Sequence, residues 1–398
     1  MMDPEVSVLL HCAEWRGLLQ TQVHVELSDS FNRQTNPCLE LHISEVWTER
    51  LSKEPWLFNG AKFRLHSSCL VSPKDPRYPQ PSHAPAQHWD EDQEKQRGDD
   101  VAVWHRMEVR NECLNQTQNV GSVFRKSASM LSQESSTPQG STGDDQSHRG
   151  PFLTLRLGLT CYKDYLGTNW SGRVSELCMR GEEEFGDPLA LLAQPLGVGA
   201  VLCTADSQVV MIRRSQRVAE AGGLLDIPGG HPEPKAVCEC LGLEVREEQI
   251  SAVMMQQRPD AVVSELFSSV SSEIRDEVNI PVGFLGAPVL LGVALNNTSA
   301  GRPSAEFYVS CSLTSDEVRK LYWKGGAEAN ESTDVVFLSR MEVLQLNRSS
   351  PLWSEMCPSA KGAILLYQAV KPDGNPTASK PELNSVHSPA PHTDQHWC

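Results

Sequence analysis

The sequence predicts a layered α/β fold whose main domain spans residues 190–370. Between residues 196 and 370, strand-like runs of Val, Leu and Ile alternate with three helical segments, as in a sheet covered by helices. Residues 153–160 alternate apolar and polar side chains, which is typical of a half-buried strand. Residues 73–150 are polar and lack such patterns. The chain is therefore expected to hold one interrupted unit and not two similar globules.

Apolar runs bounded by turn residues locate the elements of this fold. In the N-terminal part we expect strands at Val6–Leu10, Val23–Leu27, Phe63–His66 and Leu153–Thr160, a helix at Leu41–Leu51, and a short helix or turn at Tyr162–Trp170. In the main domain we expect strands at Gly199–Thr204, Val209–Arg213, Leu224–Pro228, Val289–Asn296, Ala305–Leu313 and Val335–Leu338, and helices at 262–278, Ser315–Trp323 and Ala360–Val370. If 73–150 is an insertion, Phe63–Leu70 and Leu153–Thr160 are expected to share one sheet.

Composition divides the chain further. From Lys126 to Gly150 there are seven serines and only two large apolar residues, too few to offset the entropy of ordering the chain. The predicted organisation is an N-terminal α/β subdomain in two parts (1–72 and 151–189), a disordered insertion (73–150), the main domain (190–370) and a disordered tail (371–398).

Charge and cysteine content exclude several classes of function. Lys and Arg number 35 against 51 Asp and Glu, a net charge of −16, which disfavours binding to nucleic acid or anionic membranes. No apolar run is long enough to span a bilayer, and the acidic N-terminus does not resemble a secretory signal. The 12 cysteines are scattered without a CxxC pair. These features predict a soluble cytoplasmic or nuclear protein that is not secreted.

Three carboxylates share one turn of the helix predicted at 262–278. Glu273 and Glu277 are spaced i,i+4 and Asp276 lies between them on the same face, with the acidic edge expected to face outward. Such a cluster suits Mg²⁺ or Mn²⁺, which prefer oxygen ligands. A solvated acidic face is the commoner explanation of the cluster taken alone. Upstream, Gly229 and Gly230 permit a tight turn that closely approaches a ligand.

Together these segments resemble the signature of the Nudix hydrolases, G-x5-E-x7-R-E-U-x-E-E-x-G-U, in which U is aliphatic. Gly230 matches the first glycine, and residues 273–280 match E-U-x-E-E-x-G-U with Asp276 and Asn279 as substitutions. Three features depart from the pattern. Ser272 replaces the arginine, Glu265 is one position late, and 34 residues separate Gly230 from Glu265 where the family has five. Flanking stretches most resemble the family members that hydrolyse UDP-sugars.

The resemblance implies an α/β/α sandwich and Mg²⁺-dependent hydrolysis of UDP-glucose or UDP-galactose to UMP and sugar 1-phosphate. Glu273 and Glu277 would hold the metal, and Asp276 would act beside them as a further catalytic residue. Candidates for the general base are Glu233, Glu265 and Asp276. The partner is thus a small nucleotide sugar.

A UDP-sugar requires an apolar surface for uracil and polar groups for the ribose, diphosphate and hexose. Phe58 and Tyr162 are expected to sandwich the base, and Arg214 to contact phosphate. Asp226, His231 and Glu233 flank the glycines and would face the diphosphate or the sugar, with the backbone of Ala219 and the hydroxyl of Ser359 as further contacts.

Two alternatives remain open at this stage. One is a Nudix hydrolase of another nucleoside diphosphate derivative, such as an ADP-sugar. The other is a catalytically inactive Nudix module that binds a nucleotide or protein, because the arginine that Ser272 replaces normally orients a metal-binding glutamate.

Overall fold

The computed structural model describes residues 3–71, 104–106, 152–218, 220–328 and 330–374. The insertion expected at 73–150 lies outside these ranges except for strand β4 (Trp104–Arg106), and the expected tail is described only as far as residue 374. Within the described ranges, no helix combines the length and apolar character that crossing a bilayer requires.

A mixed eight-stranded sheet forms the centre of the main domain. Its strands follow the order β1, β10, β11, β6, β7, β12, with β8 beside β7 and β9 beside β6. Their bounds are β1 (Val6–His11), β6 (Gly197–Cys203), β7 (Gln208–Arg214), β8 (Leu225–Asp226), β9 (Gly229–Gly230), β10 (Val289–Asn296), β11 (Arg302–Ser310) and β12 (Ser332–Ser339). β11 pairs with β6 in parallel, whereas β10 pairs antiparallel with β1 and β11. The N-terminal segment therefore adds an edge strand to the main sheet.

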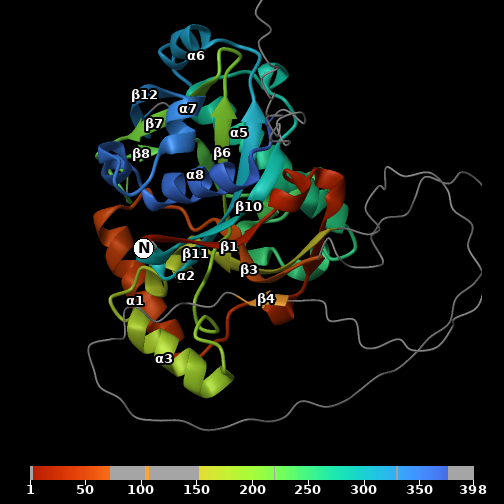
Figure 1. Cartoon of the computed structure of the whole chain (residues 1–398). Coiled ribbons are helices and arrows are strands. Elements are labelled where there is room, and N and C mark those ends of the chain that lie inside the picture. The colour runs from red at the N-terminus through yellow and green to blue at the C-terminus, as the bar shows by residue number, and fades with distance from the viewer. Residues whose placement is uncertain (1–2, 72–103, 107–151, 219, 329, 375–398) are drawn as a thin grey trace, which may run out of the picture.

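A second, smaller sheet has the order β2, β5, β3, β4, with β2 at Val23–Leu27, β5 at Leu153–Cys161 and β3 at Ala61–Leu70. β3 pairs antiparallel with β5 from Ala61 opposite Cys161 to Leu70 opposite Leu153. This pairing confirms that the two segments expected on either side of the insertion share one sheet. In Figure 1 the smaller sheet, with β3 and β4, lies below the main sheet.

Two long helices cover opposite faces of the main sheet (Figure 1). α5 (Pro259–Val278) packs with the face that carries Val198 and Ala200, and α8 (Pro358–Val370) packs with the face that carries Val201 and Leu291. These layers form the predicted α/β/α sandwich. The buried side chains of β2 join the same core as α5, so α5 lies between the two sheets and is buried along most of its length.

The remaining α-helices are α1 (Pro37–Lys53), α2 (Tyr162–Gly167), α3 (Val174–Phe185), α4 (Pro234–Cys240), α6 (Ser315–Tyr322) and α7 (Arg340–Gln345). α1 begins where the Asn36 side chain accepts hydrogen bonds from the amides of Cys38 and Leu39. α1 packs closely on α2, because a Cβ atom at Gly167 would lie 2.6 Å from Ile43 Cγ1. α3, α4 and α7 were not predicted.

Candidate active site

The turn at Gly229 and Gly230 holds Glu273 and Glu277 of α5, the two glutamates that were predicted to bind the metal. The amide of Gly229 donates a hydrogen bond of 2.9 Å to Glu277 Oε2, and the amide of His231 donates to the Glu273 carboxylate. A Cβ atom at Gly230 would lie 2.0 Å from Glu273 Oε1. A side chain at residue 230 would therefore displace the Glu273 carboxylate, and the turn positions both carboxylates through backbone groups.

Burial gives these glutamates an unusual electrostatic environment. Only 4% of Glu277 is exposed, and burial, with a contribution from Glu273, raises its pKa well above the ordinary value. Burial and repulsion by Glu328 raise the pKa of Glu273 to about 7. The expectation that the acidic edge faces outward was thus wrong for Glu277, because its carboxylate contacts the Gly229 amide and faces the loop that carries Glu328 and Glu331.

Two carboxylates that sequence reasoning missed complete the acidic cluster. Oxygens of Glu277, Glu328 and Glu331 all lie within 4.8 Å of one another. The loop that follows α6 carries Glu328 and Glu331, and the Glu328 amide anchors it by donating to the Asp276 carbonyl at 3.0 Å. Three converging carboxylates provide the hard oxygen ligands that Mg²⁺ and Mn²⁺ prefer, so the residues present fit a divalent cation.

Asp276 has a different environment from Glu277. Its carboxylate forms an ion pair with Arg275 at 2.6 Å, and it is not part of the group of three converging carboxylates. Asn279 ends α5 in the left-handed conformation with φ of 62°, as an asparagine in the glycine position of the signature should. Its side-chain amide donates to the Leu321 carbonyl at 2.8 Å and so ties α5 to α6.

We predict that Glu331→Gln weakens Mg²⁺ binding about tenfold or more, because an anionic ligand is lost from a three-carboxylate group. Calorimetric titration of Mg²⁺ into the purified protein measures this effect. Glu239→Gln, which removes an exposed carboxylate from α4, is the matched control and should bind Mg²⁺ like the wild type. Equal affinities for all three proteins would show that Glu331 is not a ligand.

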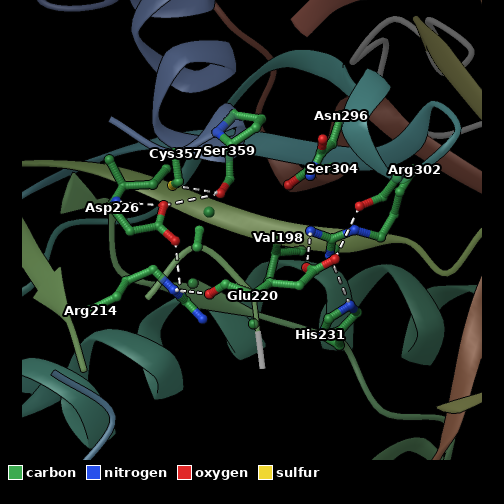
Figure 2. A pocket seen from close by; sticks show the side chains of 18 of the residues that line it. Val198, Arg214, Glu220, Asp226, His231, Asn296, Arg302, Ser304, Cys357 and Ser359 are labelled. Carbon is green, nitrogen blue, oxygen red and sulfur yellow. Dashed lines mark hydrogen bonds and ion pairs between the residues drawn. The ribbon is translucent and has the colours of Figure 1, made fainter. Parts of the chain in front are cut away.

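A cavity of about 490 Å³ opens beside the acidic cluster and is lined by β6, β9, β11 and the start of α8. Figure 2 shows Arg214, Asp226 and Ser359 on its wall. Arg214 Nη1 donates to Asp226 Oδ2 at 3.0 Å, and the Ser359 hydroxyl donates to Asp226 Oδ1 at 3.1 Å. Three residues predicted from widely separated motifs are thus joined in one network.

Glu220 and Arg302, which were not predicted, also line this cavity, with Glu220 between Arg214 and Arg302 (Figure 2). The Glu220 carboxylate accepts hydrogen bonds from the hydroxyls of Tyr165 and Ser299 and pairs with Arg302 at 3.4 Å. Arg302 Nη1 lies 3.5 Å from His231 Nε2. Burial, Lys62 and Arg302 lower the pKa of His231 well below its ordinary value, so the imidazole is neutral at pH 7.

A second pocket of about 440 Å³ adjoins the first and has aromatic walls. It contains the predicted Phe58 and Tyr162 together with Tyr165 and Trp170. The rings of Tyr162 and Tyr165 stack with centroids 6.4 Å apart, and those of Tyr165 and Trp170 at 6.1 Å. Phe58 is 64% exposed, which leaves its ring available to a ligand.

The predicted site residues therefore converge, with a few exceptions. Phe58, Tyr162, Arg214, Asp226, His231, Glu233 and Ser359 line one or both cavities. Ala219 lies outside the described residues. Of the three candidate bases, Glu233 lines the aromatic pocket and pairs with Lys62 at 3.3 Å. Glu265 accepts a hydrogen bond from the Glu233 amide at 3.0 Å, and Asp276 is paired with Arg275.

Comparison with known proteins agrees with this geometry. No family model matches the chain. Over 378 residues it is 42% identical to the uridine diphosphate glucose pyrophosphatase NUDT22 of Homo sapiens, covering 95% of this chain and 96% of that protein. The corresponding protein of Mus musculus is 43% identical over 371 residues and 93% of each chain. The chain belongs to the Nudix hydrolase family.

More distant members align over less similar sequence. Nudix hydrolase 9 of Arabidopsis thaliana is 28% identical over 92% of each chain. Among solved structures, the MutT protein from Methanosarcina mazei Go1 aligns with 44% of this Nudix hydrolase and 91% of its own chain, at 12% identity and a TM-score of 0.25. Nudix hydrolases generally need a divalent metal ion, and the carboxylates of Glu277, Glu328 and Glu331 supply a fitting group of ligands.

Proposed function

We propose that this Nudix hydrolase cleaves the diphosphate of UDP-glucose and UDP-galactose with Mg²⁺, giving UMP and the sugar 1-phosphate. The observation that carries the proposal is the continuity of the two cavities, which share Arg214, His231 and Arg302 among their lining residues. An aromatic pocket, a middle region that offers two guanidinium groups beside Glu220 and Glu331, and a polar end follow one another, in the order of a base, a diphosphate and a hexose. Relatives named for UDP-glucose pyrophosphatase activity support the same substrate class.

Each region of the site has a role in this reaction. Tyr162 and Phe58 offer ring faces to uracil. Arg214 and Arg302 offer planar guanidinium groups to phosphate oxygens, and the neutral His231 provides a hydrogen-bonding group that adds no charge. Glu277, Glu328 and Glu331, with Glu273 beside them, would hold Mg²⁺, which supplies charge neutralisation for the diphosphate and activates water.

The backbone contacts of the Gly-Gly turn argue against the alternative of an inactive module. That alternative rests on Ser272, which replaces the arginine that orients a metal-binding glutamate. Here the amides of Gly229 and His231 contact Glu277 and Glu273 directly. Backbone amides therefore orient both carboxylates without the arginine, which supports the proposal that Glu273 and Glu277 hold the metal.

The test is an assay of the purified chain with UDP-glucose and with UDP-galactose in millimolar Mg²⁺. We expect UMP and sugar 1-phosphate as products, with turnover abolished by EDTA and restored by added Mg²⁺. ADP-glucose and GDP-mannose serve as competing substrates, and faster cleavage of either would favour the other-nucleotide alternative. If the protein binds a nucleotide tightly but hydrolyses none of the four substrates, the alternative of an inactive binding module would be favoured.

A further inference from the structure

Glu306 is a buried acid that the site described above does not use. It lies in the middle of β11, and 0% of it is exposed. Neither of its carboxylate oxygens has a partner with hydrogen-bond geometry among the residues that the structure describes, although the Ser304 hydroxyl lies near enough to lower its pKa. An unpaired buried carboxyl group is destabilising, so its presence in the central sheet calls for a reason.

The carboxyl group lies directly behind the wall of the 490 Å³ cavity. A Cβ atom at Gly199 would stand 2.5 Å from Glu306 Oε2 and 2.7 Å from Ile227 Cδ1. Gly199 and Ile227 both line the cavity, as does Ser304, which is two residues earlier on the same face of β11. The absence of a side chain at Gly199 therefore leaves the space beside the cavity to the Glu306 carboxyl group.

Glu306 carries a proton at neutral pH. Burial, reinforced by repulsion from Asp226, raises its pKa to about 8, against the opposing effects of Ser304 and Arg302. A protonated carboxyl group can donate one hydrogen bond and accept others. Asp226, a charge-paired acceptor, lines the cavity, and Glu306, a neutral donor, lies behind the lining residue Gly199.

The chemistry of that end matches a sugar better than a phosphate. Its lining includes the amide of Asn296 and the hydroxyls of Ser304 and Ser359 beside Asp226. The guanidinium groups of Arg214 and Arg302 stand nearer the aromatic pocket, whose lining they share. Groups that both donate and accept are suited to hexose hydroxyls, which do the same.

We propose that Glu306 is a specificity-determining residue whose carboxyl group, which lies behind Gly199, turns into the cavity when substrate binds and hydrogen-bonds a hydroxyl of the hexose at the α8 end. This inference rests on the proposed hydrolysis of UDP-sugars. It explains why β11 keeps an acid in the core and why the facing position on β6 is glycine.

Two variants and two substrates test the proposal. Glu306→Gln keeps a neutral group that donates and accepts, whereas Glu306→Met keeps the length and removes both functions. The substrates are UDP-glucose and the methyl ester of UDP, which has the diphosphate but no hexose. We expect Glu306→Met to lower kcat/KM for UDP-glucose about tenfold, chiefly by raising KM. Its kcat/KM for the methyl ester should stay within about twofold of the wild-type value. Glu306→Gln should stay within about threefold of the wild type on both.

Tyr308→Phe is the matched control, because Tyr308 lies on the same face of β11 and packs on Tyr367 away from the cavity. The proposal would be overturned if Glu306→Met lowered kcat/KM equally for both substrates. It would also be overturned if Glu306→Met kept its melting transition and showed unchanged kinetics with both substrates. If the wild type does not hydrolyse UDP-glucose, the proposed function fails. The role of Glu306 is then decided separately by comparing how much Glu306→Met raises the Kd for UDP-glucose and the Kd for the methyl ester of UDP.

Discussion

Glu277→Gln is expected to lower kcat for UDP-glucose about a thousandfold while leaving the protein folded. The carboxylate has one oxygen fixed by the Gly229 amide and belongs to the group that includes Glu328 and Glu331. Glutamine keeps the size of the side chain and removes one negative charge from the centre of the metal-binding group. The binding of Mg²⁺, and with it the neutralisation of the diphosphate, should therefore fail. Steady-state assays at several Mg²⁺ concentrations measure the loss.

The matched control for this variant is Asp260→Asn on the first turn of the same helix, where Asp260 is exposed and paired with Arg258. It should retain full activity, which separates loss of a ligand from disturbance of α5. We also expect metal-free Glu277→Gln to unfold at a temperature no lower than the metal-free wild type, because burial and the acidic neighbours disfavour the charged form of the carboxyl group that glutamine replaces. Substantial activity of Glu277→Gln at saturating Mg²⁺ would refute the assigned role.

The central glutamates could be predicted because their spacing is local. Glu273 and Glu277 lie one helical turn apart, and any helix through Phe267, Val270, Ile274 and Val278 must place them near one another. Most strands of the main sheet were predictable for a similar reason, since their apolar runs are uninterrupted. The burial of Glu277 was not, because it depends on the Gly-Gly turn and on the loop that carries Glu328 and Glu331, both of which are distant from it in the sequence.

The residues that sequence reasoning missed come together only through tertiary structure. Glu220 and Arg302 are 82 residues apart in the sequence and pair at the wall of the cavity. Glu328 and Glu331 lie in a loop without periodicity, which is held at α5 by the bond from the Glu328 amide to the Asp276 carbonyl and by the bond from the Ser215 amide to the Glu331 carbonyl. Glu306 was read as part of an ordinary strand. A glutamate within an otherwise apolar run was the one signal in the sequence that could have identified it.

Arg214→Met is expected to reduce both stability and activity, and a second substitution separates the two effects. Arg214 is the cation that pairs with Asp226, which is 7% exposed. Leaving that carboxylate without its cation should lower the free energy of unfolding by about 3 kcal/mol. Losing the planar phosphate contact should lower kcat/KM about a hundredfold. Urea unfolding and steady-state kinetics measure the two quantities.

Adding Asp226→Asn to Arg214→Met should restore most of the stability, because the unpaired charge disappears, but should leave the activity low, because the phosphate contact is still missing. Arg214→Lys keeps the charge and loses the fork that reaches both Asp226 and the Glu220 carbonyl. We expect Arg214→Lys to be nearly as stable as the wild type and still at least tenfold less active. Recovery of activity in parallel with stability in the double variant would mean that Arg214 only holds Asp226 in place and does not contact the substrate.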